Sequence, residues 1–225
     1  MRIAACQMVS GTNIDENIHT AKSLIDSAAQ SGAELVVLPE YFSLMPASDK
    51  DWVAAAETFG DGPVQKAMSQ AAKEAQIWLV AGTIPLKAND DQHFIDACIV
   101  YNPSGEVAAR YDKIHLFQFE RSEEHYEEAQ TTQAGHEVKT VAIETWEGAW
   151  KVGLSICFDL RFPELFASST RPTLSLYRRL SQALRVALIG IHSYVPEPLK
   201  TNAMCLPALK AAITKTDVKL GGTAF

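Results

Sequence analysis

The first ninety residues alternate between two spacings of apolar positions. Apolar residues recur every three or four positions over 14–28, which predicts an amphipathic helix that ends near Gly32. The segment 34–40, "ELVVLPE", is a continuous apolar run that stops at a proline, which is typical of a buried strand in a parallel sheet. The same order follows, with a helical pattern over 62–76 and an apolar strand over 77–86.

Paired strands are predicted further along the chain. Residues 94–117 contain two β-prone runs joined by the turn "NPSG", and Lys113 stands just beyond the second run. Residues 136–157 predict a strand, a turn and a strand that ends at Cys157. Strands and helices in alternation, followed by hairpins, indicate one layered α/β domain.

Composition narrows the class of protein. The 225 residues are 47% hydrophobic and 21% charged, with a net charge of -7, which is ordinary for a globular domain. The acidic balance argues against nucleic acid or an anionic membrane as the main partner. No apolar run approaches the roughly 18–20 residues of a spanning helix, and the N-terminus shows no signal-peptide pattern. We therefore expect a cytoplasmic protein.

Four cysteines occur, at Cys6, Cys98, Cys157 and Cys205, without a CxxC pair or a histidine at zinc-ligand spacing. A disulfide framework, a structural metal site and a cofactor are therefore not expected. A reducing compartment would leave one cysteine free to act as a nucleophile.

Three polar residues stand at the ends of predicted strands: Glu40, Lys113 and Cys157. In parallel α/β sheets, ligand sites gather at the carboxyl ends of strands. A thiol, a carboxylate that takes its proton and an ammonium that stabilises an oxyanion suffice for acyl transfer. Taken alone, Cys157 is more often a small buried apolar residue, and His115 offers a minor alternative as a Cys–His pair.

Three segments in this order, "VVLPEYF", "YDKIHLF" and "GLSICFDLRFPELF", resemble the signature segments of the nitrilase (carbon–nitrogen hydrolase) superfamily. The resemblance runs almost continuously over residues 1–166. It implies an αββα sandwich in which Glu40 is the general base, Lys113 stabilises the intermediate and Cys157 is the nucleophile. It also implies a second active-site glutamate, best matched by Glu128 with Glu127 as the alternative.

The resemblance further implies that the backbone N–H of Phe158 completes an oxyanion hole. It also implies a family that is typically homodimeric, with a dimer surface that is compromised in this chain. Within the superfamily the segments resemble the branch that contains deaminated glutathione amidase and omega-amidase. The expected reaction is hydrolysis of a small amide to a carboxylate and ammonia. Omega-amidase activity, nitrile hydrolysis and a non-catalytic nitrilase-like binding protein are the alternatives. A cysteine protease or thiol oxidoreductase is disfavoured because neither a CxxC pair nor the signature segments of those enzymes occur.

Residues 167–225 lack the segments that the family shows there. Read as codons shifted by one missing base near Phe166, this tail permits the expected family segments in order, including "VENQCYV" and "WGHSI". We therefore interpret 1–166 as the nitrilase-type domain and 167–225 as an out-of-frame tail that leaves the sandwich incomplete. A natural divergent C-terminus is the alternative. This leaves open whether the chain itself is active. An intact reading frame in the DNA around the Phe166 codon would rule out the interpretation.

Overall fold

The computed structural model describes residues 1–121 and 124–169. The helices are α1 (Ile14–Gln30), α2 (Asp49–Ala55), α3 (Pro63–Ala75) and α4 (Pro163–Ser169), with short 3-10 helices η1 (Glu128–Gln130) and η2 (Cys157–Arg161). The strands are β1 (Ile3–Ala5), β2 (Leu35–Val37), β3 (Trp78–Val80), β4 (Ile84–Lys87), β5 (Phe94–Tyr101), β6 (Val107–Asp112), β7 (Gln118–Arg121), β8 (Glu124–Glu127), β9 (Thr140–Thr145) and β10 (Gly148–Gly153).

A six-stranded mixed sheet forms the centre of the described chain. Its order is β1-β2-β3-β5-β4, and β6 pairs with β5. The first three strands run parallel, whereas β4, β5 and β6 join through antiparallel pairs. All three residues of β2 are buried, as its continuous apolar sequence predicts.

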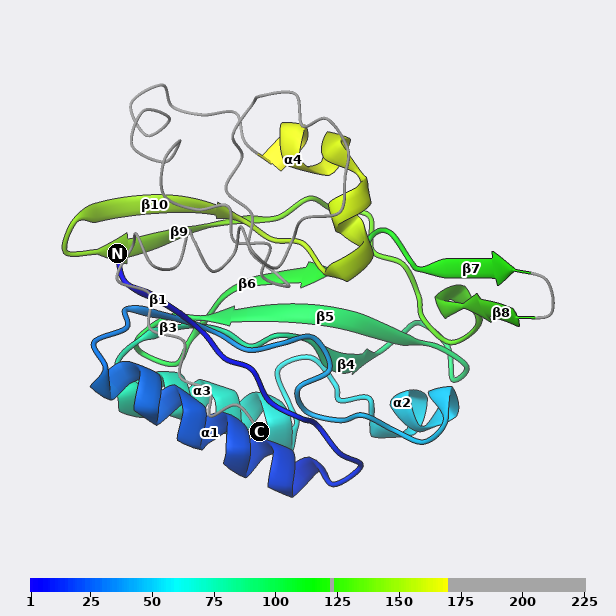
Figure 1. The fold of residues 1–225 in the computed structure, drawn as a ribbon, viewed down its shortest axis with the longest axis horizontal. Helices are drawn as coiled ribbons and strands as arrows, with labels where there is room; N and C mark the ends of the chain where they lie inside the picture. Colours follow the sequence, from blue (N-terminus) through cyan, green and yellow to red (C-terminus); the bar gives the residue numbers. More distant parts are fainter. Residues whose placement is uncertain (122–123, 170–225) are drawn as a thin grey trace.

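The two long helices, α1 and α3, cover one face of this sheet (Figure 1). Helix α1 is capped by Asn13, whose side chain accepts hydrogen bonds from two backbone N–H groups of the first turn. Its apolar residues Ala21 and Ile25 are fully buried against the sheet, and Met68 of α3 lies beside them. The helical periodicity of both segments is thus confirmed.

The hairpin β9–β10 covers the other face of the sheet. Val141, Ile143 and Val152 of the hairpin pack with Val37 and Val100 of the sheet in one apolar cluster. The expected α/β class is confirmed, with a helix layer, a sheet and the start of a second sheet. Helix α4 lies beyond the hairpin (Figure 1), where "DLRFPEL" predicts that the chain enters a helix.

The segment 77–86 differs from its prediction as one strand, because the chain turns between β3 and β4. At the turn, Gly82 has φ +45, and a Cβ there would lie 1.9 Å from the carbonyl oxygen of Pro39. Only glycine permits that backbone conformation and so close an approach. The contact brings the end of β3 against the segment that leads from β2 to Glu40.

The strand that precedes Cys157 is also shorter than predicted, because β10 ends at Gly153. The sequence patterns did not predict α2 or the hairpin β7–β8 either. No helix among residues 1–121 and 124–169 is long and apolar enough to cross a membrane. The out-of-frame interpretation concerns residues 167–225, and those from 170 onward lie outside the described residues.

Candidate active site

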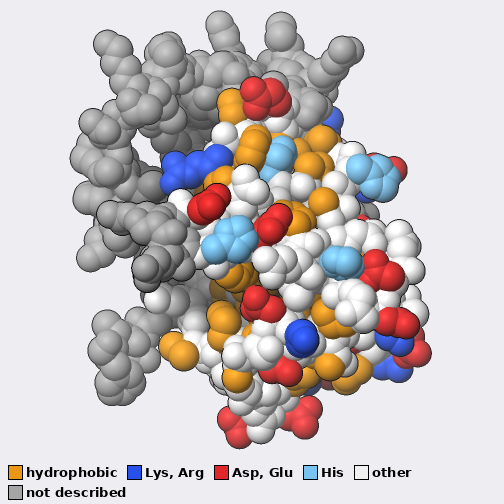
Figure 2. Space-filling model, turned by 90° about the vertical axis from the view of Figure 1, so that its right-hand side faces the viewer, with side chains coloured by type: hydrophobic (Ala, Val, Ile, Leu, Met, Phe, Trp, Pro, Cys, Tyr) orange, Lys and Arg blue, Asp and Glu red, His pale blue; other side chains and the backbone are white. Residues whose placement is uncertain are grey.

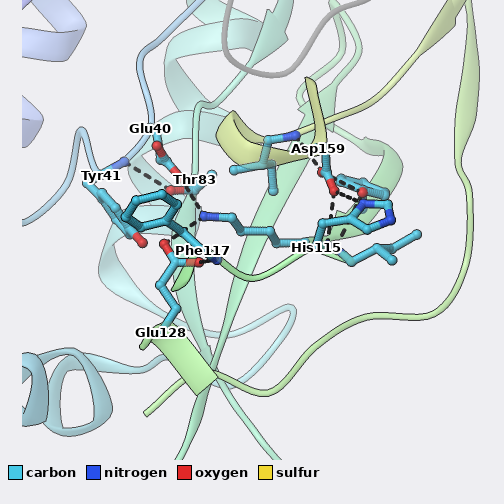
Figure 3. A network of polar contacts seen from close by, with 11 residues as sticks. Glu40, Tyr41, Thr83, His115, Phe117, Glu128 and Asp159 are labelled. Carbon is cyan, nitrogen blue, oxygen red and sulfur yellow. Dashed lines mark hydrogen bonds and ion pairs between the residues drawn. The ribbon is translucent and has the colours of Figure 1, made fainter. Parts of the chain in front are cut away.

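Lys113 lies buried between two carboxylates at one end of the sheet. Its side chain is 0% exposed, and its Nζ is 3.1 Å from Glu40 Oε1 and 2.8 Å from Glu128 Oε1. Figure 3 shows the carboxylates of Glu40 and Glu128 on either side of this ammonium group. Of the two adjacent glutamates considered from the sequence, Glu128 is the one that contacts Lys113. Glu127 pairs with the exposed His125 instead.

Backbone hydrogen bonds fix the positions of Lys113 and of the segment that carries Glu40. The Lys113 N–H donates to the carbonyl oxygen of Asp96 at 3.0 Å, which continues the β5–β6 pairing by one residue beyond the strand. Glu40 precedes Tyr41, whose φ of 56 lies in the left-handed region. The Tyr41 N–H donates to Thr83 Oγ1 at 2.9 Å, so the turn after Gly82 holds the segment that carries Glu40.

Glu128 reaches the same point from a different part of the chain. It begins the 3-10 helix η1 after β8 and is buried. Its Oε2 accepts a hydrogen bond of 2.7 Å from the Phe117 N–H, while Oε1 faces Lys113. Both carboxylate oxygens are therefore engaged, and Glu128 orients the lysine ammonium.

The carboxyl groups around Lys113 keep its side chain positively charged. Burial alone would lower the pKa of Lys113, but the nearby carboxyl groups of Glu40, Asp96 and Glu128 outweigh it and raise that pKa. Lys113 is therefore an ammonium at all physiological pH values. Two of its three N–H donors are used by Glu40 and Glu128.

Cys157 is presented at a sharp turn between the end of β10 and η2. Its φ of 45 is left-handed, a conformation that costs energy in a residue other than glycine and that is frequent at functional sites. The residue as a whole is exposed, yet its thiol is partly desolvated and lies close enough to the Glu40 carboxylate to feel its charge. Burial and Glu40 raise the pKa of Cys157 to about 11, although Lys113 opposes them. The resting group is thus a thiol beside the Glu40 carboxylate.

Asp159 ties the segment of Cys157 to the segment of Lys113. This carboxylate is fully buried and accepts hydrogen bonds from the Ile156 N–H at 2.8 Å and the Tyr111 hydroxyl at 2.7 Å. It also contacts the N–H and ring Nδ1 of His115 at 3.0 and 2.6 Å (Figure 3). No pattern in the sequence predicted a role for Asp159. The sequence does place a carboxylate two residues after Cys157 and a histidine in "YDKIHLF", and these two residues contact each other in the structure.

His115 is therefore engaged away from the thiol. Its ring faces Asp159 and stacks on Phe162 with ring centroids 3.7 Å apart. The structure brings Cys157 together with Glu40 and not with His115, so the geometry does not favour the Cys–His alternative.

Replacing Asp159 by alanine should destabilise the protein by about 3–5 kcal/mol. The change leaves the Tyr111 hydroxyl and the N–H groups of Ile156 and His115 without their buried acceptor. Urea denaturation followed by circular dichroism measures the effect. The matched control is Asp91→Ala, which removes an exposed carboxylate and should alter stability little. Equal effects of the two changes would contradict this role of Asp159.

Replacing Glu40 by glutamine should make the resting Cys157 thiol more reactive. The Glu40 charge and hydrogen bond both raise the pKa of Cys157, whereas Lys113 lowers it. Removing the carboxylate therefore lowers that pKa and increases the thiolate fraction at pH 8. The rate of labelling with methyl methanethiosulfonate, followed by peptide mass spectrometry at Cys157, measures this. Glu127→Gln is the control, and slower labelling in Glu40→Gln would contradict the arrangement.

Phe158 follows Cys157 in the first turn of η2, where backbone N–H groups have no acceptor within the helix. Its ring makes edge-to-face contacts with Phe117 and Phe162, which fix the residue beside the site. The face shown in Figure 2 mixes acidic, histidine and apolar side chains, with its basic side chains scattered rather than gathered. Residues 1–121 and 124–169 contain no cluster of three His, Cys, Asp or Glu side chains able to hold a metal ion.

Comparison with known proteins agrees with the architecture. Residues 2–190 match the family model described as carbon–nitrogen hydrolase. The chain is 38% identical over 165 residues to nitrilase homolog 2 of Dictyostelium discoideum, covering 73% of this chain and 48% of that protein. It is 34% identical over 167 residues to deaminated glutathione amidase of Yersinia enterocolitica, covering 73% and 56% respectively. The chain thus spans about half the length of these relatives.

Solved structures show the same fold. The NitFhit protein of C. elegans aligns with a TM-score of 0.64 at 30% identity, covering 80% of this chain and 42% of that one. Nit3 of Saccharomyces cerevisiae, described as a member of the nitrilase superfamily, aligns with a TM-score of 0.63 at 26% identity, covering 80% and 61%. With the family match, these similarities show that the chain belongs to the carbon–nitrogen hydrolase family of the nitrilase superfamily.

Proposed function

We propose that the site hydrolyses the C–N bond of a small amide through a thioester on Cys157. The observation that supports this best is the contact of one carboxylate, Glu40, with both the Cys157 thiol and the Lys113 ammonium. A thiol, its base and a buried cation thereby meet at one point. That combination serves acyl transfer without a metal ion or a cofactor.

The first half-reaction forms the acyl-enzyme. As the sulfur of Cys157 attacks the amide carbon, Glu40 accepts the thiol proton. The resulting oxyanion receives hydrogen bonds from the remaining N–H of Lys113 and from the backbone N–H of Phe158. When the tetrahedral intermediate collapses, the C–N bond breaks and Glu40 returns the proton to the leaving nitrogen. Ammonia leaves and a thioester remains.

The second half-reaction consumes water. Glu40, ionised again, takes a proton from a water molecule whose oxygen attacks the thioester carbon. The C–S bond then breaks, the sulfur regains its proton from Glu40, and the acid leaves and loses its remaining proton to solvent water to become a carboxylate. Glu128 touches no reacting atom in this scheme. It holds Lys113 in place through its two engaged oxygens.

The relatives' names support a proposal for the substrate class. Relatives at 34% identity are named deaminated glutathione amidase and, in Pongo abelii, omega-amidase. We therefore propose a small amide of a keto or carboxylic acid, with the first of these activities preferred, in a cytoplasmic homodimer. Omega-amidase activity, nitrile hydrolysis and a non-catalytic binding role are the competing outcomes.

Ammonia release from a panel of small amides and nitriles tests the proposal. Two proteins are compared: the chain as given, and a frame-restored chain in which one base is added near the Phe166 codon. Deaminated glutathione should be the best substrate. Preference for short ω-amides or for nitriles would select one of the other hydrolases. Binding of these compounds without ammonia release by either protein would support the non-catalytic role and contradict the proposal.

A further inference from the structure

Asp96 is a buried carboxyl group for which the proposed reaction has no use. It lies in β5 and is 1% exposed. Neither of its carboxyl oxygens has a hydrogen-bond partner among the residues that the structure describes. A buried carboxylate is ordinarily paired with a cation or with several donors, because an isolated charge is costly in an apolar interior. Asp96 therefore requires an explanation.

The sheet places Asp96 at the candidate site. Its backbone is opposite Pro85 of β4, and its carbonyl oxygen accepts the N–H of Lys113. Alternation along β5 puts its side chain on the same face as Cys98 and Val100, both of which belong to the cluster covered by β9–β10. The carboxyl group thus stands at the catalytic end of the sheet without an opening to solvent.

The surroundings of Asp96 contain more acids than cations. Burial and the neighbouring Glu40 raise the pKa of Asp96 well above its usual range, with a smaller contribution from Glu128, and Lys113 opposes them. The Thr83 hydroxyl also opposes them, although it makes no hydrogen bond of ordinary geometry with either oxygen. Tyr41 and Cys98 are the other titratable groups in electrostatic contact, and both are neutral at physiological pH.

Lys113 is the one ammonium group among these neighbours, and its ion pairs go to Glu40 and Glu128. A third carboxylate would compete for its remaining N–H and would add negative charge beside Glu40. Added negative charge favours the protonated form of Glu40, which could then not accept the thiol proton. Ionised Asp96 would therefore oppose two steps of the proposed reaction.

We propose that Asp96 is a positioning residue that keeps its proton in the active enzyme, so that the cluster holds two carboxylates and one ammonium. The neutral carboxyl leaves one N–H of Lys113 for the oxyanion and leaves Glu40 ionised as the base. This role rests on the proposed function, whereas the protonated state of Asp96 is tested without any catalysis.

The protonated state has a direct signature in the unaltered full chain. With ¹³C-labelled aspartate, one side-chain carboxyl resonance should keep the chemical shift of the protonated form through neutral pH. It should be missing in Asp96→Asn and present in Asp112→Asn. Asp112 is a matched control on the neighbouring strand, because it is partly exposed and paired with Arg110. If every aspartate resonance of the unaltered chain has titrated by pH 6, the proposal is wrong.

Folding stability gives a second readout with a defined sign. A carboxyl whose pKa is higher in the folded than in the unfolded state binds more protons when folded, so its presence reduces stability as pH rises above about 4. The folding constant of Asp96→Asn, divided by that of the unaltered chain, should therefore increase above about pH 4, by up to about tenfold per pH unit. The increase should stop at the pH where Asp96 ionises in the folded state. A ratio that falls as pH rises would show that Asp96 is an ionised and stabilised group, and would overturn the proposal. A ratio that does not change with pH would also overturn the proposal.

The positioning role is tested by the pH profile of kcat/KM for ammonia release, in whichever of the two chains hydrolyses amides. Asp96→Asn cannot ionise, so its activity relative to the unaltered enzyme should increase with pH on the alkaline side. A constant ratio would overturn the positioning role. Absence of ammonia release from both chains would instead contradict the proposed function, and the resonance and stability measurements would still decide the state of Asp96.

Discussion

Replacing Cys157 by alanine is expected to reduce ammonia release by at least about 10⁴-fold, because removal of a catalytic nucleophile leaves only binding and oxyanion stabilisation. The loss should appear in kcat, since the thiol acts on the reacting carbon and adds little to substrate binding. Coupled measurement of ammonia with the best substrate of the panel detects it. Circular dichroism should show an unchanged fold, because Cys157 is exposed.

Cys6→Ala provides the matched control. Cys6 is also a free cysteine with a pKa raised to about 11 by burial, but it packs against the apolar cluster beneath α1. The control should retain the activity of the unaltered chain. Equal losses in both variants, or retention of activity in Cys157→Ala, would exclude Cys157 as the nucleophile.

Replacing Lys113 by methionine is expected to reduce stability as much as Asp159→Ala does, by about 3–5 kcal/mol. Methionine fills a similar volume but leaves Glu40 and Glu128 as buried carboxylates without their shared cation. Ammonia release should vanish as well, because the oxyanion loses its charged donor. Urea denaturation at pH 7 measures the stability, with Lys66→Met as control. Lys66 forms its ion pair with Asp61 on the surface, so its replacement should alter stability little.

A second variant separates lost charge from lost packing. Adding Glu128→Gln to Lys113→Met removes one of the two uncompensated carboxylates, so the double variant should recover part of the stability that the single variant loses. Activity should not return, because the cation is still missing. If the double variant is less stable than the single one by the full effect of Glu128→Gln alone, the two residues are not coupled.

Much of the fold follows from local pattern in the sequence. The helical spacing over 14–28 and the apolar run at 34–40 correspond to α1 and β2, because amphipathic and fully buried elements leave different periodicities. The break between β3 and β4 was missed because it depends on the close approach of Gly82 to Pro39. That contact joins segments more than forty residues apart, and no window of sequence contains both.

The candidate site, like the fold, is only partly predictable from the sequence. Glu40, Lys113 and Cys157 stand in distinctive segments, so the sequence proposes them as site residues, and the structure adds that Glu128 is the glutamate that faces Lys113. Asp159 and Asp96 were not identified, because their importance lies in burial and in partners from other strands. An isolated aspartate in a sequence looks the same whether it is exposed, fully hydrogen-bonded like Asp159 or unpartnered like Asp96.

The acyl-enzyme itself provides the most direct test of the account. The frame-restored chain and the chain as given are mixed with the best amide, quenched in acid within the first turnover, digested and analysed by mass spectrometry. The account predicts a peptide containing Cys157 whose mass is increased by the acyl group and which hydroxylamine converts to the free thiol and a hydroxamate. An acyl group on any other residue, or turnover with hydroxylamine present that yields no hydroxamate, would contradict catalysis through a Cys157 thioester.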